Sequence, residues 1–452
     1  MKIVIAGAGR VGYSIAQELV MENHNIIVID ESEERIKEIS NNLDVLTIVG
    51  NAACYDTLKE ADLKNVDLLI AVTKMDELNL LSCLTAKKLG VTHTIARVRN
   101  SEYFKQAIFL NDELGLSMTI NPEEETASEI SRILRFPMAS KVESFANSKA
   151  ESIEIKVASG SALDGVNLSD LRSKMGDVLV CAVKRDKEVF IPRGDFIIEA
   201  GDRLNIIGSY KNINSFIKKV GKAHNAKKTI VFGGGTITYY LAGQLVNTDI
   251  SLKVIEKRKD ECAKIKEAFP KVSVICANGN NPDILGEEGI EIADAFVAVS
   301  NDDDDNVISS MYALSSGVEK VVTKIKEGHI IAMLSNDRLD SIVQPSSIAT
   351  QRVVRYVRSM QNAYGDSGID AMYYIFDQKV EILEMKVNDN FHYKGIPLKE
   401  LEVSHDAIVA SIIHNGKCII PTGNDVISSG DIVILATTRK GVLTLGDIVE
   451  TK

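Results

Sequence analysis

The chain has 452 residues, 45% apolar and 25% charged, values typical of a globular protein of about two to four domains rather than a disordered or fibrous one. Its net charge of −11, with no basic stripe, argues against a primary role on nucleic acid. Because it has no apolar run of the roughly 18 residues that a membrane span needs and no basic-then-apolar leader, we expect a soluble, cytoplasmic protein.

The N-terminal segment begins with an apolar strand, "KIVIAG", a glycine-rich turn, a helical stretch over 14–21 and a second strand, "NIIVID". Three more short apolar segments follow, "DVLTIV", "DLLIAV" and "HTIARV". Short apolar strands that alternate with helical segments indicate a parallel sheet covered by helices on both faces. We therefore predict a Rossmann-like, doubly wound α/β domain of about 140 residues.

The pattern changes near Glu151, where "SIEIKVA" alternates apolar and polar residues as a half-exposed strand does. A short helix, "LSDLRSK", and two strands joined at a tight polar turn, "DVLVCAVKRDKEVFIP", come next. These elements predict a small α+β module. The polar segment before it, "FPMASKVESFANSKA", and its later counterpart "YVRSMQNAYGDSG" are interpreted as connectors with helical stretches.

The whole arrangement then repeats. Gly7 matches Gly233 and Asp30 matches Glu256, both 226 positions apart. "AVTKMDELN" over 71–79 matches "AVSNDDDDN" over 298–306, and "IPRGDFIIEAGDRL" from Ile191 matches "IPTGNDVISSGDIV" from 420. A repeat of this length predicts two Rossmann-like domains at 1–140 and 226–355, each followed by a small α+β domain, at 141–225 and 356–452.

The first glycine turn has the spacing of a dinucleotide site. Gly7 permits a tight bend, Gly9 lets the backbone approach a pyrophosphate, and Gly12 lets helix and strand pack closely. The amides at the start of the next helix favour anions without a basic side chain. Asp30 ends the following strand, where a carboxylate can bind both ribose hydroxyls and repel a 2′-phosphate, so NAD is preferred over NADP.

Further candidates lie where the predicted strands end, because doubly wound sheets bind ligands at their carboxyl edge. The residues after the third strand are expected to border the adenine, and a guanidinium at Arg97 can reach a phosphate. Arg10 can do the same or can face water. The candidate nucleotide-binding residues of the first copy are Gly7, Ala8, Gly9, Arg10, Val11, Gly12, Asp30, Asn51, Ala52, Thr73, Lys74 and Arg97.

The second copy departs from this pattern. Thr238 replaces the third glycine, so we expect its helix to stand slightly farther from the strand. Thr236, Asn301 and Lys324 replace Arg10, Lys74 and Arg97, which reduces the positive charge. The candidate residues are Gly233, Gly234, Gly235, Thr236, Ile237, Glu256, Asn278 and Ser300.

Four consecutive carboxylates, Asp302 to Asp305, lie near this second site. Beside a pyrophosphate they would repel the ligand unless a divalent cation bridged them, whereas in a solvated loop they cost little. The solvated loop is the favoured interpretation.

The repeated modules do not assemble a catalytic set. A dehydrogenase adds a substrate domain that presents an acid or base to the nicotinamide. Here His392, His405 and His414 occur only in the second copy, so each is interpreted as a surface residue. No cysteine or histidine spacing suits zinc. We expect binding without turnover, no catalytic residue and no metal site, the alternative being an NAD-dependent oxidoreductase that uses the first domain.

Motifs in order along the chain resemble a known family. "KIVIAGAGRVGYSIAQEL", "VGNAACYDTL" and "DLLIAVTKMDELNLL" resemble the regulator-of-potassium-conductance (RCK or KTN) nucleotide-binding domain. "LDGVNLSDL" and "IPRGDFIIEAGDRLNIIG" resemble its C-terminal companion, whose Gly-Asp recurs in "SGDIVILA". Two such pairs in tandem resemble the TrkA family over essentially the whole chain.

The resemblance implies a regulatory subunit for potassium transport. It implies NAD(H), together with ATP and ADP, as ligands. It further implies a homotetramer ring of eight RCK domains, peripheral on the inner face of the cell membrane, that gates a TrkH- or TrkG-type potassium-translocating subunit.

Overall fold

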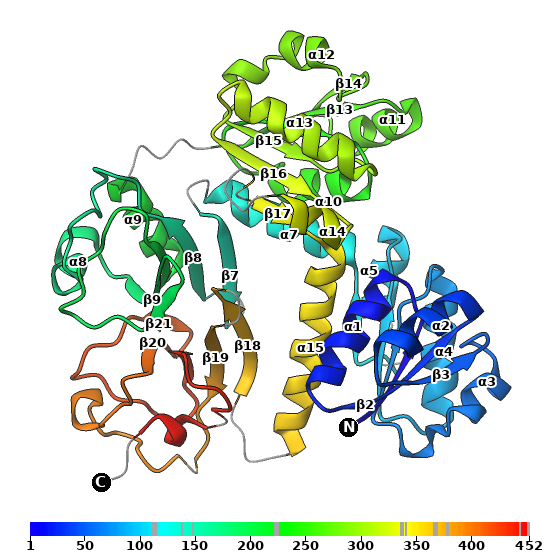
Figure 1. The fold of residues 1–452 in the computed structure, drawn as a ribbon, viewed down its shortest axis with the longest axis horizontal. Coiled ribbons are helices and arrows are strands. Elements are labelled where there is room, and N and C mark those ends of the chain that lie inside the picture. Colours follow the sequence, from blue (N-terminus) through cyan, green and yellow to red (C-terminus); the bar gives the residue numbers. More distant parts are fainter. Residues whose placement is uncertain are drawn as a thin grey trace.

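The structure is a computed structural model whose ribbon is drawn in Figure 1. The part of the chain that the structure describes contains four sheets, two with parallel strands and two with antiparallel strands. The residues that the structure describes are 1–109, 115–136, 139–146, 149–220, 226–334, 339, 341–364, 369–376, 379–389, 391–442 and 444–449.

The first parallel sheet has the order β3-β2-β1-β4-β5-β6 and, with its helices, forms what we call the first lobe. Its strands are β1 (Lys2–Ala6), β2 (Asn25–Asp30), β3 (Leu46–Val49), β4 (Leu68–Ala71), β5 (His93–Arg97) and β6 (Met118–Ile120). Its helices are α1 (Arg10–Met21), α2 (Glu33–Asn42), α3 (Tyr55–Glu60), η1 (Leu63–Asn65), α4 (Asp76–Lys88) and α5 (Ser101–Phe109).

Alternate residues of the central strand explain why both faces are covered. Ile3 and Ile5 pack with α1, whereas Val4 and Ala6 pack with the helices of the other face, and all four are fully buried. Side chains of a strand point alternately to its two sides, so a wholly apolar strand needs a layer of helices on each. The predicted doubly wound α/β fold is confirmed.

The second lobe repeats the order as β14-β13-β12-β15-β16-β17. Its strands are β12 (Lys228–Phe232), β13 (Ser251–Glu256), β14 (Ser273–Cys276), β15 (Ala295–Ala298), β16 (Lys320–Lys324) and β17 (Ser341–Val343). Its helices are α10 (Thr236–Leu245), α11 (Lys259–Ala268), α12 (Pro282–Glu287), η2 (Ile290–Ile292), α13 (Asp303–Ser315) and α14 (Gly328–Met333).

The two antiparallel sheets form the first and second modules, in the orders β10-β9-β11-β8-β7 and β18-β19-β22-β20-β21. The first module contains β7 (Lys141–Phe145), β8 (Ala150–Lys156), α8 (Leu168–Met175), β9 (Leu179–Arg185), β10 (Glu188–Phe190), β11 (Arg203–Gly208) and α9 (Tyr210–Val220). The second contains β18 (Ile369–Ile375), β19 (Val380–Lys386), η3 (Leu398–Glu400), β20 (Ala407–His414), β21 (Lys417–Ile419), β22 (Ile432–Thr437) and η4 (Leu445–Ile448).

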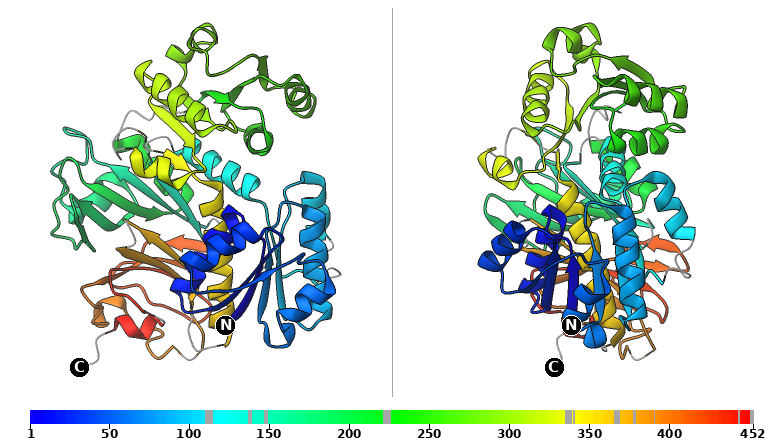
Figure 2. Two further views of the ribbon diagram at one scale, coloured as in Figure 1. Left: turned by 45° about the vertical axis from the view of Figure 1, so that its right-hand side comes forward. Right: turned by 90° about the vertical axis from the view of Figure 1, so that its right-hand side faces the viewer.

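The lobes exchange helices. Helix α7 (Pro122–Arg135), which follows the first lobe in the chain, packs on α10 of the second lobe. Helix α15 (Pro345–Tyr364), which follows the second lobe, packs on α1 of the first. Figures 1 and 2 show both, with the yellow α15 lying along the blue α1. Each lobe therefore completes its core with a helix from the other copy.

The modules are joined in a similar way, because apolar side chains of both sheets form one core cluster. Phe145 and Ile207 of the first module pack there with Phe376 and Ile434 of the second. The amide of Ala146 also donates to a carboxylate oxygen of the second module at 2.9 Å. The two copies thus form one pair within the chain.

Two expectations meet the structure differently. The prediction that "FPMASKVESFANSKA" is a connector with helical stretches is wrong for its centre, because Lys141–Phe145 is strand β7 and pairs with β8. Val142 and Phe145 of this strand are buried, which explains why it joins the sheet. The four-domain division stays a prediction, and its boundary between 355 and 356 lies inside α15.

Among the described residues, no helix combines the length and apolar character needed to cross a membrane.

Candidate functional site

The glycine turns lie between the first and fourth strands of each lobe. Gly7 has φ +113°, and a Cβ on it would lie 2.9 Å from the amide nitrogen of Thr73. Gly233 has φ +100°, and a Cβ there would lie 2.7 Å from the amide nitrogen of Ser300. Both positions therefore require glycine, for conformation and for space. The turns bring the predicted residues Thr73 and Ser300 to the glycine main chain.

Helices α1 and α10 begin directly after these turns with unsatisfied amides. Their N-cap residues are Gly9 and Gly235, and neither helix has a side-chain cap or an acidic residue in its first turn. The first amides of a helix have no partner within it and carry partial positive charge. Each turn is therefore a cradle that fits a phosphate group.

The predicted ribose carboxylates also brace the turns. Asp30 accepts from the amide of Ala8 at 2.7 Å and from that of Ser32 at 2.9 Å. Glu256 accepts from the amides of Gly234 and Arg258, at 2.7 and 2.9 Å. A carboxylate has about four lone-pair sites, so acceptor capacity remains for ribose hydroxyls.

The side-chain lengths at this contact compensate between the copies. A Cβ on Gly234 would lie 2.8 Å from the Cβ and 2.9 Å from the Cγ of Glu256, so this position requires glycine in the second copy. In the first copy Ala8 and the shorter Asp30 occupy the two positions. The hydrogen bond from the turn amide to the carboxylate is thus present in both copies. The first copy has Ala8 with Asp30, and the second has Gly234 with the longer Glu256.

The third position of the turn differs as the sequence predicts. A Cβ on Gly12 would lie 1.8 Å from the carbonyl oxygen of Gly7, which no structure permits. Thr238 stands at the equivalent position, fully buried, and its hydroxyl donates to the carbonyl of Gly233 at 2.5 Å. Because Thr238 carries a Cβ, the start of α10 must stand farther from its turn than the start of α1 does.

A buried asparagine joins two strand ends in each lobe, and the sequence reasoning missed it. Asn79 accepts from the amide of Thr73 at 2.8 Å and donates to the carbonyl of Arg97 at 2.9 Å. Asn306 repeats this, accepting from the amide of Ser300 at 2.9 Å and donating to the carbonyl of Lys324 at 3.0 Å. Both close the matched repeat segments, which was the available signal.

The cations that end β5 and β16 are Arg97, which is half-buried, and Lys324, which is buried. Burial lowers the pKa of the Arg97 guanidinium, and its Nε has no hydrogen-bond partner among the described residues. Lys324 is 4% exposed and donates to the carbonyl of Val299 at 3.3 Å. Burial, with a smaller effect of Lys326, lowers its pKa to about 8. Each lobe therefore has, at the end of its fifth strand, a cation whose charged form an anionic ligand would stabilise.

Arg10 makes a contact that the sequence did not suggest. Its guanidinium forms an ion pair with Glu327, which follows β16 in the second lobe. Both side chains are partly exposed, so the pair is open to competition from a ligand phosphate. The alternative that Arg10 only faces water is wrong.

The remaining candidates divide by exposure. Lys74, Thr236 and Asn278 are exposed and Asn51 is half-buried. The side chains of Val11, Ala52 and Ile237 are buried in the cores of the lobes, at 8%, 3% and 6% exposed. For these three, only main-chain atoms are available to a ligand.

The acidic run from Asp302 to Asp305 begins a helix, so its interpretation as a solvated loop is wrong. Asp302 is the N-cap of α13 and accepts from the amide of Asp305, and Asp303 to Asp305 form the first turn. Asp303 is buried and accepts from the amides of Lys326 and Glu327. Carboxylates at a helix N-terminus are stabilised by its dipole, which explains the run without a metal ion.

The interpretation of His414 as a lone surface residue is also wrong. Its Nδ1 lies 2.7 Å from Oδ1 of Asp431. Arg185, at the matching position of the first module, pairs with Asp202 at 2.8 Å. In both modules the aspartate of the Gly-Asp motif holds a side chain of the neighbouring strand, which is a structural role.

Comparison with protein families gives matches in both halves of the chain. Residues 3–122 and 229–345 match the TrkA-N domain. Residues 153–221 and 382–449 match the TrkA-C domain. The two domain types alternate along the chain in the order of the lobes and modules.

Similar proteins cover nearly the whole chain. "Trk system potassium uptake protein TrkA homolog" of Archaeoglobus fulgidus is 32% identical over 435 residues, which are 96% of this chain and 97% of that protein. "Trk system potassium uptake protein TrkA" of Haemophilus influenzae is 28% identical over 98% of this chain and 97% of its own.

Two solved structures have the same fold. "Crystal Structure of the GsuK RCK domain" has a TM-score of 0.63 and 15% identity, covering 97% of this chain and 92% of its own. "GsuK channel bound to NAD" has a TM-score of 0.64 and 15% identity, covering 97% of this chain and 77% of its own.

Proposed function

The chain belongs to the TrkA family, and from this premise we propose that it is a nucleotide-sensing regulatory subunit of a potassium uptake system. Its relatives of near-equal length carry the names of Trk potassium uptake proteins. In this proposal the chain binds NAD(H), ATP or ADP and gates a TrkH- or TrkG-type potassium-translocating subunit without consuming the nucleotide.

The cradles at Gly9 and Gly235 support nucleotide binding. Each offers bare helix amides to a phosphate, with a carboxylate, Asp30 or Glu256, at the end of the next strand for a ribose. The neighbour described as the GsuK channel bound to NAD has this fold. We propose the candidate residues of both copies as the binding residues, those with buried side chains acting through their main chain.

The observation that carries the regulatory role is the exchange of helices. Helix α1 starts at the first cradle and packs on α15, which in turn packs on β18 of the second module. Helix α10 starts at the second cradle and packs on α7, which contacts β7 of the first module. A ligand that shifts α1 or α10 thereby shifts a module. It changes the equilibrium by its difference in affinity for the two arrangements.

Exposed apolar side chains on equivalent helices support assembly into a ring. Leu81 on α4 and Ile308 on α13 occupy matching positions and are 54% and 63% exposed. Phe109 on α5 and Met333 on α14 are each 82% exposed. Such residues in both lobes suggest faces that another molecule covers. We propose a homotetramer of eight RCK domains on the inner face of the cell membrane.

Calorimetry and flux measurements test this function. We expect NAD, NADH, ATP or ADP to bind the purified chain, with Asp30→Ala and Gly235→Asp each removing binding at one copy. We expect nucleotide to change rubidium flux through a TrkH-type subunit reconstituted with the chain. Hydride transfer from NADH to a metabolite would favour the oxidoreductase alternative, and absence of nucleotide binding would refute the proposal.

A further inference from the structure

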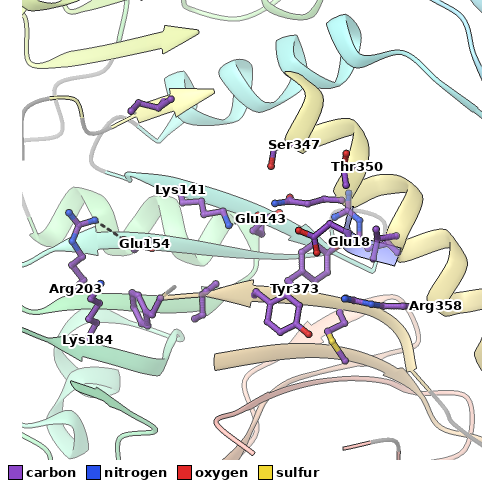
Figure 3. Close-up of a pocket in the computed structure, with 18 of the residues that line it drawn as sticks. Glu18, Lys141, Glu143, Glu154, Lys184, Arg203, Ser347, Thr350, Arg358 and Tyr373 are labelled. Atoms are coloured by element: carbon purple, nitrogen blue, oxygen red, sulfur yellow. Dashed lines mark hydrogen bonds and ion pairs between the residues drawn. The ribbon is translucent and has the colours of Figure 1, made fainter. Parts of the chain in front are cut away.

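A cavity of about 690 Å³ lies between α15, the β7–β11 sheet and β18 (Figure 3). The described residues that line it include none of either glycine turn. Its volume is in the range of small-molecule pockets. It lies where α15, which follows the second lobe in the chain, faces the sheet of the first module.

The wall formed by α15 is rich in hydrogen-bond donors. Residues three or four apart on a helix share a face, and the face toward the cavity carries Ser347, Thr350, Gln351, Arg355 and Arg358. The opposite face is apolar and packs on α1. The polar face is therefore suited to a ligand that supplies acceptors.

Thr350 is the first donor without an acceptor. It is 3% exposed, and its hydroxyl has no hydrogen-bond partner among the described residues. Leaving a buried hydroxyl unpaired costs on the order of 1–3 kcal/mol, so such a group in a cavity wall points to an acceptor that the ligand brings.

Arg355 is a second group of this wall without a carboxylate partner. Its guanidinium lies over the ring of Tyr373, with the guanidinium carbon 4.8 Å from the ring centroid. No ion pair holds it within the described part of the chain, although its neighbour Arg358 is paired with Glu22. A guanidinium that lines a cavity and has five N–H donors but no carboxylate partner is suited to an oxyanion such as phosphate.

The carboxylates of the opposite wall do not neutralise this charge. Glu143 is paired with Lys141 at 3.2 Å, and Glu154 with Arg203 at 3.0 Å. Two further carboxylates line the cavity, Glu18 and Asp186. They are acceptors for hydroxyl groups rather than partners for an anion.

We propose that this cavity binds a small phosphorylated molecule with several hydroxyl groups, a sugar phosphate or a nucleoside monophosphate. Its phosphate binds Arg355 and Thr350, and its hydroxyl groups donate to Glu18 and Asp186. Because α15 also packs on α1, an occupied cavity would fix the first lobe against the first module. The cavity would then be a second kind of ligand site, besides the glycine turns, that affects how the lobes and modules are arranged.

Calorimetry with ribose 5-phosphate and with AMP tests the proposal on the full chain carrying Gly9→Asp and Gly235→Asp, which block both turns. We expect at least one probe to bind this double variant, and ribose without phosphate not to bind. Added Arg355→Met or Thr350→Val should weaken binding about tenfold or more. Arg352→Met, which removes a cation of α15 paired with Glu125 outside the cavity, should change it less than about twofold.

Two sets of results would overturn the proposal. One is that neither phosphate binds the double variant, which would mean that any binding to the wild type occurs at the turns. The other is that Thr350→Val, which leaves size unchanged, and Arg355→Met both keep the affinity of the parent. Preference for ribose 5-phosphate or for AMP would identify the source of the phosphate.

Discussion

The two lobes have the same strand order, the same bracing of the turn by a carboxylate and the same buried asparagine between strand ends. They differ in residues that we propose contact the nucleotide. The first has a third glycine and Arg97, and the second has Thr238 and Lys324. The contacts that shape the cradle are thus kept, while the third residue of the turn and the kind of cation that ends the fifth strand have changed. One scaffold can in this way hold two sites of different affinity.

Gly12→Ala should have the largest effect in this comparison. The new Cβ would meet the carbonyl of Gly7 at 1.8 Å, a backbone atom that cannot turn away. We expect a loss of about 3 kcal/mol or more in the free energy of unfolding of the first lobe. Urea denaturation followed by circular dichroism measures it. Gly9→Ala is the control, because no heavy atom lies within 4 Å of its Cβ. Equal stability of the two variants would contradict the close approach of α1.

Gly9→Asp and Gly235→Asp should each remove one site without unfolding a lobe. Neither added Cβ has a heavy atom within 4 Å, and aspartate is a good N-cap. Its carboxylate would occupy the bare amides and repel phosphate, so we expect about a hundredfold weaker binding at that copy, which is about 2.7 kcal/mol. Calorimetry should show the stoichiometry per chain fall by one site for each change. Unchanged stoichiometry in either variant would place the nucleotide elsewhere.

Lys324→Met should reveal the cost of the buried cation. The pKa of Lys324 is about 8 in the folded chain against 10.5 ordinarily, because burial outweighs the attraction of Asp303 and Glu123. Between these values the unfolded chain holds more protons, so wild-type stability should rise with pH from about 8 to about 10.5. Below pH 8 the charged form destabilises the fold, and Lys324→Met should gain on the order of 2 kcal/mol at pH 7.

Urea denaturation at several pH values measures this difference. The rise between pH 8 and 10.5 should be missing in Lys324→Met and present in Lys326→Met, whose side chain is 32% exposed in the wild type. A wild-type stability that is flat across this range would show that the ammonium is well solvated.

Glu327→Gln should have the smallest effect. The ion pair with Arg10 is partly exposed, so its loss should cost less than about 1 kcal/mol of stability. The released guanidinium lies beside the first cradle, so the affinity for ATP at the first copy should rise about two- to fivefold. Titration of the Gly235→Asp background isolates this copy. An affinity that falls instead would mean that the pair itself shapes the turn.

The sequence was sufficient for the repeat and for the doubly wound α/β fold, because both follow from the spacing of apolar strands, helical segments and glycines along the chain. It was not sufficient for the exchange of α7 and α15. The apolar positions of a helix predict that one of its faces is buried, but not that α7 packs on α10 and α15 on α1. The role of Asp303 was missed for a similar reason, since its partners, the amides of Lys326 and Glu327, follow the next strand. That Asp302 caps a helix could have been inferred from the run of acids before a helical segment.

The exchange of α7 and α15 takes place inside a single polypeptide, and this has a consequence for concentration. In a protein whose repeats were separate chains, such a pairing would weaken on dilution. Here the linking peptide supplies each half with its counterpart at a high effective concentration whatever the expression level. One half of the chain can then lose ligand affinity and still be held in place by the other half. The sequences of the two halves can therefore diverge while the packing of α7 and α15 keeps the halves together.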